Sequence, residues 1–260
     1  MTDHHLSDEE ETEMLEEIHT TATAEKFRNF VCEEVPLQPD DSVLSVGCGP
    51  GFETAVLAQQ VGEAGSVTGI DVNEDVLATA RDRCRDLPQV SFQHGDVTDL
   101  PVADERYDLA IAKQVLQFVD DVDSALGELY RVIKPGGRIA VVEGARESQV
   151  IHSSDPERMR RANEVYRTGR GDRHFGTRLV SLLPEAGFTT EDVVSRSSVQ
   201  REINDQIERG IEVQRGFLES SEVFDDSEIN AWEQDLRGLD DAGQFLFSAI
   251  TLLYIGRKPV

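Results

Sequence analysis

The chain has 260 residues, of which 25 are basic and 51 are acidic, so its formal net charge at pH 7 is −26. This length is enough for one substantial hydrophobic core and favours a single α/β domain with insertions. The negative charge argues against nucleic acid or an anionic membrane surface as a partner, because both would repel the protein.

The three cysteines, Cys32, Cys48 and Cys84, are far apart in the sequence and include no C-x-x-C pair. This pattern argues against a zinc site and against a disulfide framework. We therefore predict no metal site and a reducing, cytoplasmic location.

The excess of acidic residues goes together with a shortage of lysine, because almost all of the basic residues are arginines. This composition resembles that of proteins from halophilic archaea, in which surface carboxylates hold water and cations. An ordinary acidic cytosolic protein is the alternative. The halophilic interpretation predicts that self-repulsion destabilises the fold in dilute buffer and that high salt screens this repulsion.

The first 36 residues are predicted to form an acidic segment and a helix that precede the main domain, which is expected to span 37–260. Residues 1–10 are polar enough to be disordered, and a loose apolar stripe from Glu11 to Val35 has helical spacing. The N-terminus lacks the basic and then apolar order of a signal peptide. The longest apolar stretch, 245–255, is about half of the ~20 residues that span a bilayer, so we expect no membrane insertion.

The mostly apolar run Val43–Val46 predicts a buried parallel strand that ends at a glycine-rich loop. Gly47, Gly49 and Gly51 follow it, and the apolar spacing beyond Gly51 changes to that of a helix. Such a loop points backbone N–H groups and the positive end of a helix at a ligand above it. The spacing is G-x-G-x-G, whereas a dinucleotide fingerprint would need a third glycine in place of Phe52.

This segment resembles the first motif of class I S-adenosylmethionine-dependent methyltransferases, in which the loop passes under the methionine and ribose of the cofactor. The resemblance implies S-adenosylmethionine as the cofactor and implies that Cys48 also lines its site. No basic residue is close to Cys48 in the sequence, so we expect its thiol to be a small filler of the loop. The family usually has an acidic residue, which helps to bind the cofactor's ammonium group, where this chain has Ser45.

A second predicted strand, Ser66–Asp71, ends in a carboxylate that is well placed to accept hydrogen bonds from both ribose hydroxyls of an adenosine cofactor. A solvent-facing aspartate at a strand end is an equally good interpretation of Asp71 alone. Dehydrogenases also use an acid here, so Asp71 supports adenosine without choosing the chemistry. In the methyltransferase family, the residue after this acid packs on the adenine ring, a role that the resemblance gives to Val72.

The third strand, 89–93, precedes Gly95-Asp96, which resembles the family's next motif. The resemblance implies that Asp96 accepts a hydrogen bond from the adenine amino group and that the Val97 N–H binds a ring nitrogen. The fourth strand, 107–112, delivers Lys113 to the edge where open α/β sheets bind ligands. Lys113 is a candidate partner of the cofactor's carboxylate, and a solvated lysine is the alternative.

The rest of the chain continues the family pattern, with a helical region over 115–133, a Pro-Gly-Gly turn and a fifth strand over 138–142. Two variable segments, 144–176 and 200–240, are predicted to contact the substrate. Apolar residues at helical spacing in the second favour a hydrophobic substrate or, alternatively, cover the sheet. A closing strand is expected over 245–254, antiparallel to the others as in the family.

Methyl transfer from a sulfonium needs alignment and water exclusion more than a catalytic group, and a base helps only when the acceptor must lose a proton. His174, Tyr166 and Glu143 are weak candidates for that base, each of which is better explained as structural or solvated.

These observations predict a seven-stranded, mostly parallel Rossmann-like sheet with helices on both faces and an antiparallel last strand. The expected function is S-adenosylmethionine-dependent methylation of a small, hydrophobic molecule, as in enzymes of quinone biosynthesis. A non-catalytic S-adenosylmethionine-binding protein and a Rossmann oxidoreductase are the alternatives, and a homodimer is left open. The predicted cofactor-binding residues are Gly47, Cys48, Gly49, Gly51, Asp71, Val72, Asp96, Val97 and Lys113.

Overall fold

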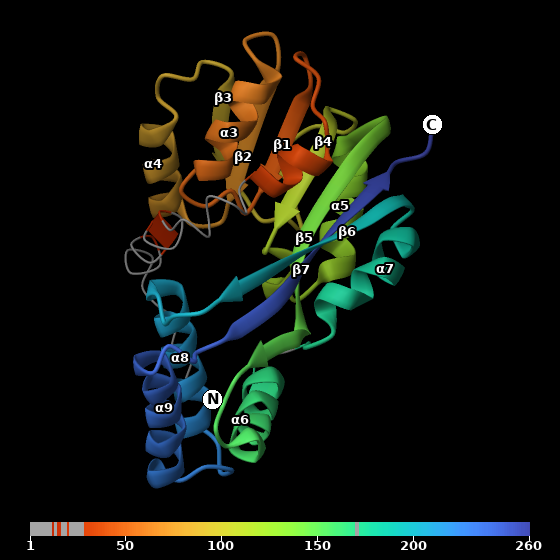
Figure 1. Cartoon of the computed structure of the whole chain (residues 1–260). Coiled ribbons are helices and arrows are strands. Elements are labelled where there is room, and N and C mark those ends of the chain that lie inside the picture. The colour runs from red at the N-terminus through yellow and green to blue at the C-terminus, as the bar shows by residue number, and fades with distance from the viewer. Residues whose placement is uncertain (1–11, 13–14, 17–19, 21–28, 170–171) are drawn as a thin grey trace. The chain divides into compact units, whose positions relative to one another are not determined.

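The structure is a computed structural model that describes residues 12, 15, 16, 20, 29–169 and 172–260 (Figure 1). The predicted disorder of residues 1–10 and most of the predicted N-terminal helix lie outside these residues, although 29–34 are helical. The elements are β1 (Ser42–Val46), α3 (Phe52–Val61), β2 (Ser66–Asp71), α4 (Glu74–Arg83), β3 (Val90–His94), β4 (Tyr107–Lys113), η1 (Leu116–Phe118), α5 (Val122–Val132), β5 (Ile133–Ile151), α6 (Pro156–Gly169), α7 (Phe175–Glu185), β6 (Thr189–Gln200), α8 (Asp205–Glu219), α9 (Asp226–Asp241) and β7 (Phe247–Arg257).

The strands form one seven-stranded sheet in the order β3-β2-β1-β4-β5-β7-β6, which confirms the predicted fold class. β1 pairs in parallel with both β2 and β4, β2 pairs in parallel with β3, and β4 pairs in parallel with β5. β7 is antiparallel to β5, because the Gly136 N–H donates to the Lys258 carbonyl while the Lys258 N–H donates to the Gly137 carbonyl. The ligand-binding edge of this topology is the carboxyl end of β1, β2 and β4.

The chain divides into two compact units, each of which gathers distant stretches of sequence. Unit 1 contains Met1–Glu143, Leu179–Val194 and Leu253–Val260, and unit 2 contains Gly144–Arg178 and Ser195–Leu252. The predicted division into an N-terminal segment, a main domain and two variable segments stays a prediction.

The core of unit 1 packs the sheet against α3 and the helix at 29–34. Val43, Leu109 and Ile111 come from the strands, Leu57 comes from α3, and Phe30 lies beside them, all of them buried. Most residues of β1 and β4 are apolar, as is typical of strands covered on both faces, and the exceptions are Ser42, Ser45, Asp108 and Lys113.

The core of unit 2 is built by three helices, α6, α8 and α9. Met159 of α6, Ile211 of α8 and Trp232 of α9 belong to one buried cluster. The apolar residues at helical spacing in this segment therefore pack against one another, and Trp232 is 1% exposed. Ile151 of β5 and Phe247 of β7 also pack against this cluster, which agrees with the alternative that the apolar residues cover the sheet.

Two predicted elements between residues 115 and 142 differ from the structure. The single helical region is interrupted, because α5 begins only at Val122, where the Asp121 side chain accepts the Ser124 N–H and caps it. The Pro-Gly-Gly turn lies inside β5, where the pairing with β4 shifts register and Gly136 has φ of 81°. The start of α5 is set by a polar cap, and the course of β5 is set by a bulge. Neither feature can be predicted from the spacing of apolar residues.

Lys258 follows β7 and ties the end of this strand to α5. It is 7% exposed, and its ammonium group donates to the carbonyl oxygens of Tyr130 and Ile133. A cation at the last carbonyls of a helix satisfies acceptors that have no partner within the helix. No helix in the described part of the chain is long and apolar enough to cross a membrane.

Candidate cofactor site

The glycine loop leaves β1 in a left-handed backbone conformation. Gly47, Gly49 and Gly51 have φ angles of 56°, 53° and 80°, a region that side chains other than glycine rarely adopt. The Cys48 N–H continues the pairing of β1 with β2 by donating to the Ile70 carbonyl at 3.1 Å. Gly51 then caps the N-terminus of α3, so the predicted sequence of strand, loop and helix is confirmed.

Asp71 at the end of β2 lies directly against this loop. Its Oδ2 accepts the Gly49 N–H at 2.9 Å, and its Oδ1 accepts the Asn73 N–H at 3.1 Å. The carboxylate therefore fixes the loop to the neighbouring strand and is half-buried. The structure brings together two parts of the predicted site that are 22 residues apart in the sequence.

The three glycines have different surroundings. A Cβ on Gly51 would lie 3.0 Å from the Cβ of Ala80 in α4, and a Cβ on Gly47 would lie 2.2 Å from Cγ2 of Val115. Among the described residues, a Cβ on Gly49 would meet no heavy atom within 4 Å. Gly47 and Gly51 are therefore required by packing, whereas Gly49 borders open space that a ligand can enter.

Asp96 and Val97 follow β3 and present complementary polar groups. Asp96 Oδ1 accepts the N–H and the hydroxyl of Thr98, and these hydrogen bonds hold the pKa of the carboxyl below its usual value. Among the described residues, Asp96 Oδ2 and the Val97 N–H form no hydrogen bond. The pair thus offers one acceptor and one donor, while the Val97 side chain is buried.

Val72 comes directly after Asp71 and is 61% exposed, which is unusual for a large apolar residue next to a buried strand. Its side chain provides an apolar surface beside the carboxylate. Phe118 in η1, after β4, is 67% exposed.

Lys113 at the end of β4 pairs with Glu53, a residue that the sequence analysis missed. The Lys113 Nζ lies 3.2 Å from Glu53 Oε1, and the two side chains are only 13% and 9% exposed. Glu53 lies in the first turn of α3, where the helix dipole favours an anion. The sequence signal that could have identified Glu53 is an acid two residues after the last glycine of the loop.

Replacing Lys113 with methionine is expected to destabilise the protein by about 3 kcal/mol, because it leaves the carboxylate of buried Glu53 without its cation. Urea unfolding in constant salt measures the effect. The double variant K113M/E53Q should recover part of the loss. If the double variant is less stable than K113M alone, the carboxylate of Glu53 is not held by Lys113.

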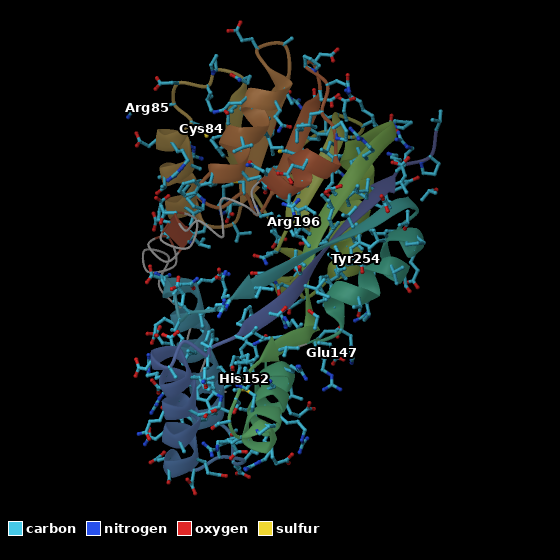
Figure 2. All side chains as sticks on the ribbon, in the orientation of Figure 1. Cys84, Arg85, Glu147, His152, Arg196 and Tyr254 are labelled. Carbon is cyan, nitrogen blue, oxygen red and sulfur yellow. The ribbon has the colours of Figure 1, made fainter. Side chains whose placement is uncertain are left out.

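Arg83 supports the glycine loop from α4 and was also missed, because no local pattern marks it. Its guanidinium binds both carboxylate oxygens of Glu16, donates to the Pro50 carbonyl at 3.3 Å and lies 3.4 Å from the centroid of the Phe52 ring. Cys84 comes directly after α4 (Figure 2), and its Sγ lies 3.8 Å from the Gly51 carbonyl oxygen. The last turn of α4 therefore holds the far side of the loop.

The Cys48 thiol has no sign of activation. Burial, followed by the nearby carboxylate of Asp71, raises its pKa well above the ordinary value for cysteine. A thiol in these surroundings stays neutral and is a poor nucleophile.

Of the three candidate bases, one lies in unit 1 and two lie in unit 2. Glu143 is in unit 1, buried at the point where β5 leaves that unit, and its Oε1 accepts the Gln117 N–H at 3.4 Å. His174 and Tyr166 are in unit 2. His174 Nε2 accepts a hydrogen bond from Arg173, and the Tyr166 ring packs edge-on against Phe217 at 5.8 Å.

Comparisons with known proteins identify the family. A family profile described as a methyltransferase domain matches residues 37–206, which is more than half of the chain. An uncharacterised 37.1 kDa protein in transposon TN4556 of Streptomyces fradiae is 35% identical over 195 residues, which cover 74% of this chain and 56% of that protein.

A demethylmenaquinone methyltransferase of Lysinibacillus sphaericus is 32% identical over 117 residues, which cover 45% of this chain and 50% of the relative. The chain thus spans about half the length of these curated relatives. Among solved structures, a putative methyltransferase from Bacillus halodurans shares the fold, with a TM-score of 0.64 and 22% identity over 90% of this chain and 100% of that one. The chain therefore belongs to the methyltransferase-domain family, in the class I group whose cofactor is S-adenosylmethionine.

Proposed function

We propose that this protein transfers a methyl group from S-adenosylmethionine to a small, hydrophobic molecule. The observation that carries the proposal is the hydrogen bond from the Gly49 N–H to Asp71, beside open space at Gly49. It joins a loop that a ligand can approach to a carboxylate that can accept two ribose hydroxyls.

The adenosine half of the cofactor fits the groups around Asp71. Each oxygen of Asp71 accepts a backbone N–H, and a carboxylate oxygen can accept more than one hydrogen bond. Asp96 Oδ2 and the Val97 N–H match the amino group and a ring nitrogen of adenine, and exposed Val72 offers the ring an apolar surface. We therefore propose that these four residues bind the adenosine half of the cofactor.

The methionine half would lie near the end of β4. Ser45 is buried in β1, so no carboxylate stands where the family usually has one. We propose that Glu53, in the first turn of α3, supplies the negative charge for the cofactor's ammonium group and that Lys113 faces its carboxylate. The ion pair between Glu53 and Lys113 keeps these opposite charges in position.

When bound, S-adenosylmethionine supplies a methyl group on a positively charged sulfur that is already a good leaving group. The protein then has to align the acceptor and exclude water. His174 and Tyr166 stay predictions as bases, since the reaction needs one only for an acceptor that must lose a proton.

The hydrophobic nature of the acceptor is supported by the relative named demethylmenaquinone methyltransferase. The apolar residues of α8 and α9, from which the sequence favoured a hydrophobic substrate, do not support this property of the acceptor. Ile211, Trp232 and Leu236 are buried in the core of unit 2 and do not wall an open pocket.

The proposal is tested by calorimetric titration of S-adenosylmethionine and S-adenosylhomocysteine, followed by transfer of radiolabelled methyl to a panel of reduced naphthoquinones and phenols. Micromolar binding and a labelled product that requires both reactants are expected. Binding without transfer to any acceptor would favour the non-catalytic binding protein. Binding of NAD in place of S-adenosylmethionine would favour the oxidoreductase.

We also propose that the protein works at high salt. Its net charge of −26 should make the melting temperature rise by at least about 5 °C between 0.1 M and 2 M KCl, because the Debye length falls to about 3 Å near 1 M salt and self-repulsion is screened. Differential scanning calorimetry measures the shift, with sucrose as a non-ionic control for general stabilisation. A flat melting temperature in KCl would contradict a halophilic origin.

A cytoplasmic location is proposed on the three free thiols of Cys32, Cys48 and Cys84. A homodimer is a further proposal, and sedimentation equilibrium in molar KCl distinguishes it from a monomer.

A further inference from the structure

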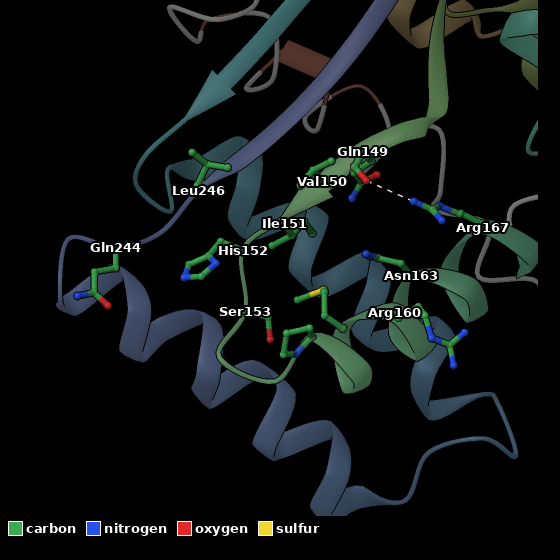
Figure 3. Close-up of a pocket in the computed structure, with 12 residues that line it drawn as sticks. Gln149, Val150, Ile151, His152, Ser153, Arg160, Asn163, Arg167, Gln244 and Leu246 are labelled. Carbon is green, nitrogen blue, oxygen red and sulfur yellow. Dashed lines mark hydrogen bonds between the residues drawn. The ribbon is translucent and has the colours of Figure 1, made fainter.

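A pocket of about 650 Å³ lies in unit 2, between the end of β5, helix α6 and the residues that lead into β7 (Figure 3). All of its lining residues come from unit 2, so the pocket is complete within that unit. Its volume falls in the range of about 300–1,000 Å³ that is typical of small-molecule sites. We call it the α6 pocket.

One part of the α6 pocket is apolar. Val150 and Ile151 of β5, Pro156 and Met159 of α6, and Leu246 before β7 all line it. Val150 is 56% exposed and Leu246 is 37% exposed, although both are large apolar residues. An apolar ligand body that covered them would remove this surface from water, which is favourable at roughly 25 cal/mol per Å².

The charged residues of the α6 pocket have the opposite sign to the protein as a whole. Arg160 and Arg167 line it, and none of the twelve described lining residues is an aspartate or a glutamate. In a chain with 51 acidic and 25 basic residues, this lining is a local reversal of charge. The pocket is therefore suited to a ligand with a negative charge.

Arg167 and Asn163 are held on α6 in a way that leaves hydrogen-bond donors available. Arg167 Nη2 donates to the Gln149 carbonyl at 3.3 Å and forms no other hydrogen bond within the described residues (Figure 3). Asn163 Oδ1 accepts from Gln214 at 3.2 Å, so its amide nitrogen keeps its donors. A guanidinium has five N–H donors in a fork that matches a carboxylate.

Arg160 donates to Glu157 from Nη2 at 2.7 Å and from Nε at 3.1 Å, which leaves Nη1 for a ligand, and the two side chains are 66% and 70% exposed. An ion pair with this exposure contributes little to stability, so a ligand can compete for the guanidinium. Arg160 thus provides a second guanidinium, on an exposed side chain, in addition to that of Arg167, which is held by the Gln149 carbonyl.

We propose that the α6 pocket binds a small carboxylic acid with an apolar body. The carboxylate pairs with Arg167 and Arg160, and the apolar body covers Val150, Met159 and Leu246. A monoanion fits better than a phosphate, because a second negative charge would be repelled by the rest of this acidic protein. The site needs neither the cofactor nor methyl transfer, so its test is independent of the proposed function.

The experiment is a calorimetric titration of 1-naphthoate into the whole chain without cofactor, compared with the neutral analogue 1-naphthamide. Naphthoate is expected to bind at one site and at least tenfold more tightly than the amide. The variant R160Q/R167Q should lose at least tenfold in affinity for naphthoate and should not change its affinity for the amide by more than about twofold.

Arg158 provides the matched control, because it lies on the same helix, pairs with the acid three residues before it, Asp155, and does not line the pocket. The variant R158Q should bind naphthoate as the unmodified protein does. Fluorescence of Trp232, the single tryptophan, reports that unit 2 is folded in each variant. Equal binding of naphthoate and naphthamide, or equal losses in R158Q and R160Q/R167Q, would overturn the proposal.

Discussion

Replacing Asp71 with asparagine is expected to weaken S-adenosylmethionine binding by about 100-fold. The carboxylate accepts N–H groups from Gly49 and Asn73 and, by our proposal, two ribose hydroxyls. Hydrogen bonds to a charged group contribute roughly 1.5–3 kcal/mol each, and about 2.7 kcal/mol corresponds to a 100-fold change in affinity. In an asparagine, an NH2 group replaces one of the two carboxylate oxygens and faces a backbone N–H that then has no acceptor. This should cost about 1–2 kcal/mol of stability.

Calorimetric titration of the cofactor measures the affinity of D71N, and urea unfolding measures its stability. Asp75 is the matched control, because it is an exposed aspartate in the first turn of α4 and its carboxylate makes no contact with the loop among the described residues. D75N should bind the cofactor within about twofold of the unmodified protein. A folded D71N that binds with full affinity would remove Asp71 from the cofactor site.

Alanine at Gly47 is expected to be the most damaging single substitution in the glycine loop. Its Cβ would lie 2.2 Å from Val115 Cγ2, and φ at this position is 56°. The left-handed conformation costs about 1–2 kcal/mol and the steric clash costs roughly 1–3 kcal/mol more. The sum is a large share of the ~5–15 kcal/mol that stabilises a typical domain.

Gly49 gives the contrasting case, since its φ of 53° is nearly the same but a Cβ there would meet no atom of the described residues within 4 Å. G49A should therefore fold with a loss of only about 1–2 kcal/mol, and its methyl group should hinder the cofactor. Urea unfolding and cofactor titration separate the two effects. The double variant G47A/V115A should recover about 1–2 kcal/mol relative to additive losses, and strict additivity would mean that Val115 is not the obstacle.

The sequence predicted the part of the site that depends on local pattern. The change from apolar strand to helical spacing around Gly47 and Gly51 is visible in a dozen residues. Asp71 and Asp96 are each found because they follow a strand, and parallel strands deliver their carboxyl ends to one edge. Gly49 and Asp71 can form their hydrogen bond because β1 and β2 are neighbouring parallel strands that end at the same edge.

The parts that were missed depend on tertiary contacts. Arg83 meets Pro50 and Glu16 through packing that no spacing rule contains. The apolar pattern of α8 and α9 predicted either a substrate wall or a cover for the sheet, and Trp232 and its neighbours form a core against which Ile151 of β5 and Phe247 of β7 also pack. Periodicity shows which face of a helix is buried, and it cannot show whether a protein neighbour or a ligand covers that face.

The division of unit 1 into three stretches of chain also has a consequence for its folding during synthesis. Leu253 and Ile255 belong to the same buried cluster as Val43 and Val142, although all of unit 2 is translated between Val142 and Leu253. A nascent chain that ends near Glu143 already contains the glycine loop, Asp71 and Asp96 but lacks the residues that close this core. We expect the growing polypeptide to expose apolar surface until β7 emerges from the ribosome. A chaperone should therefore bind the nascent chain before the cofactor does.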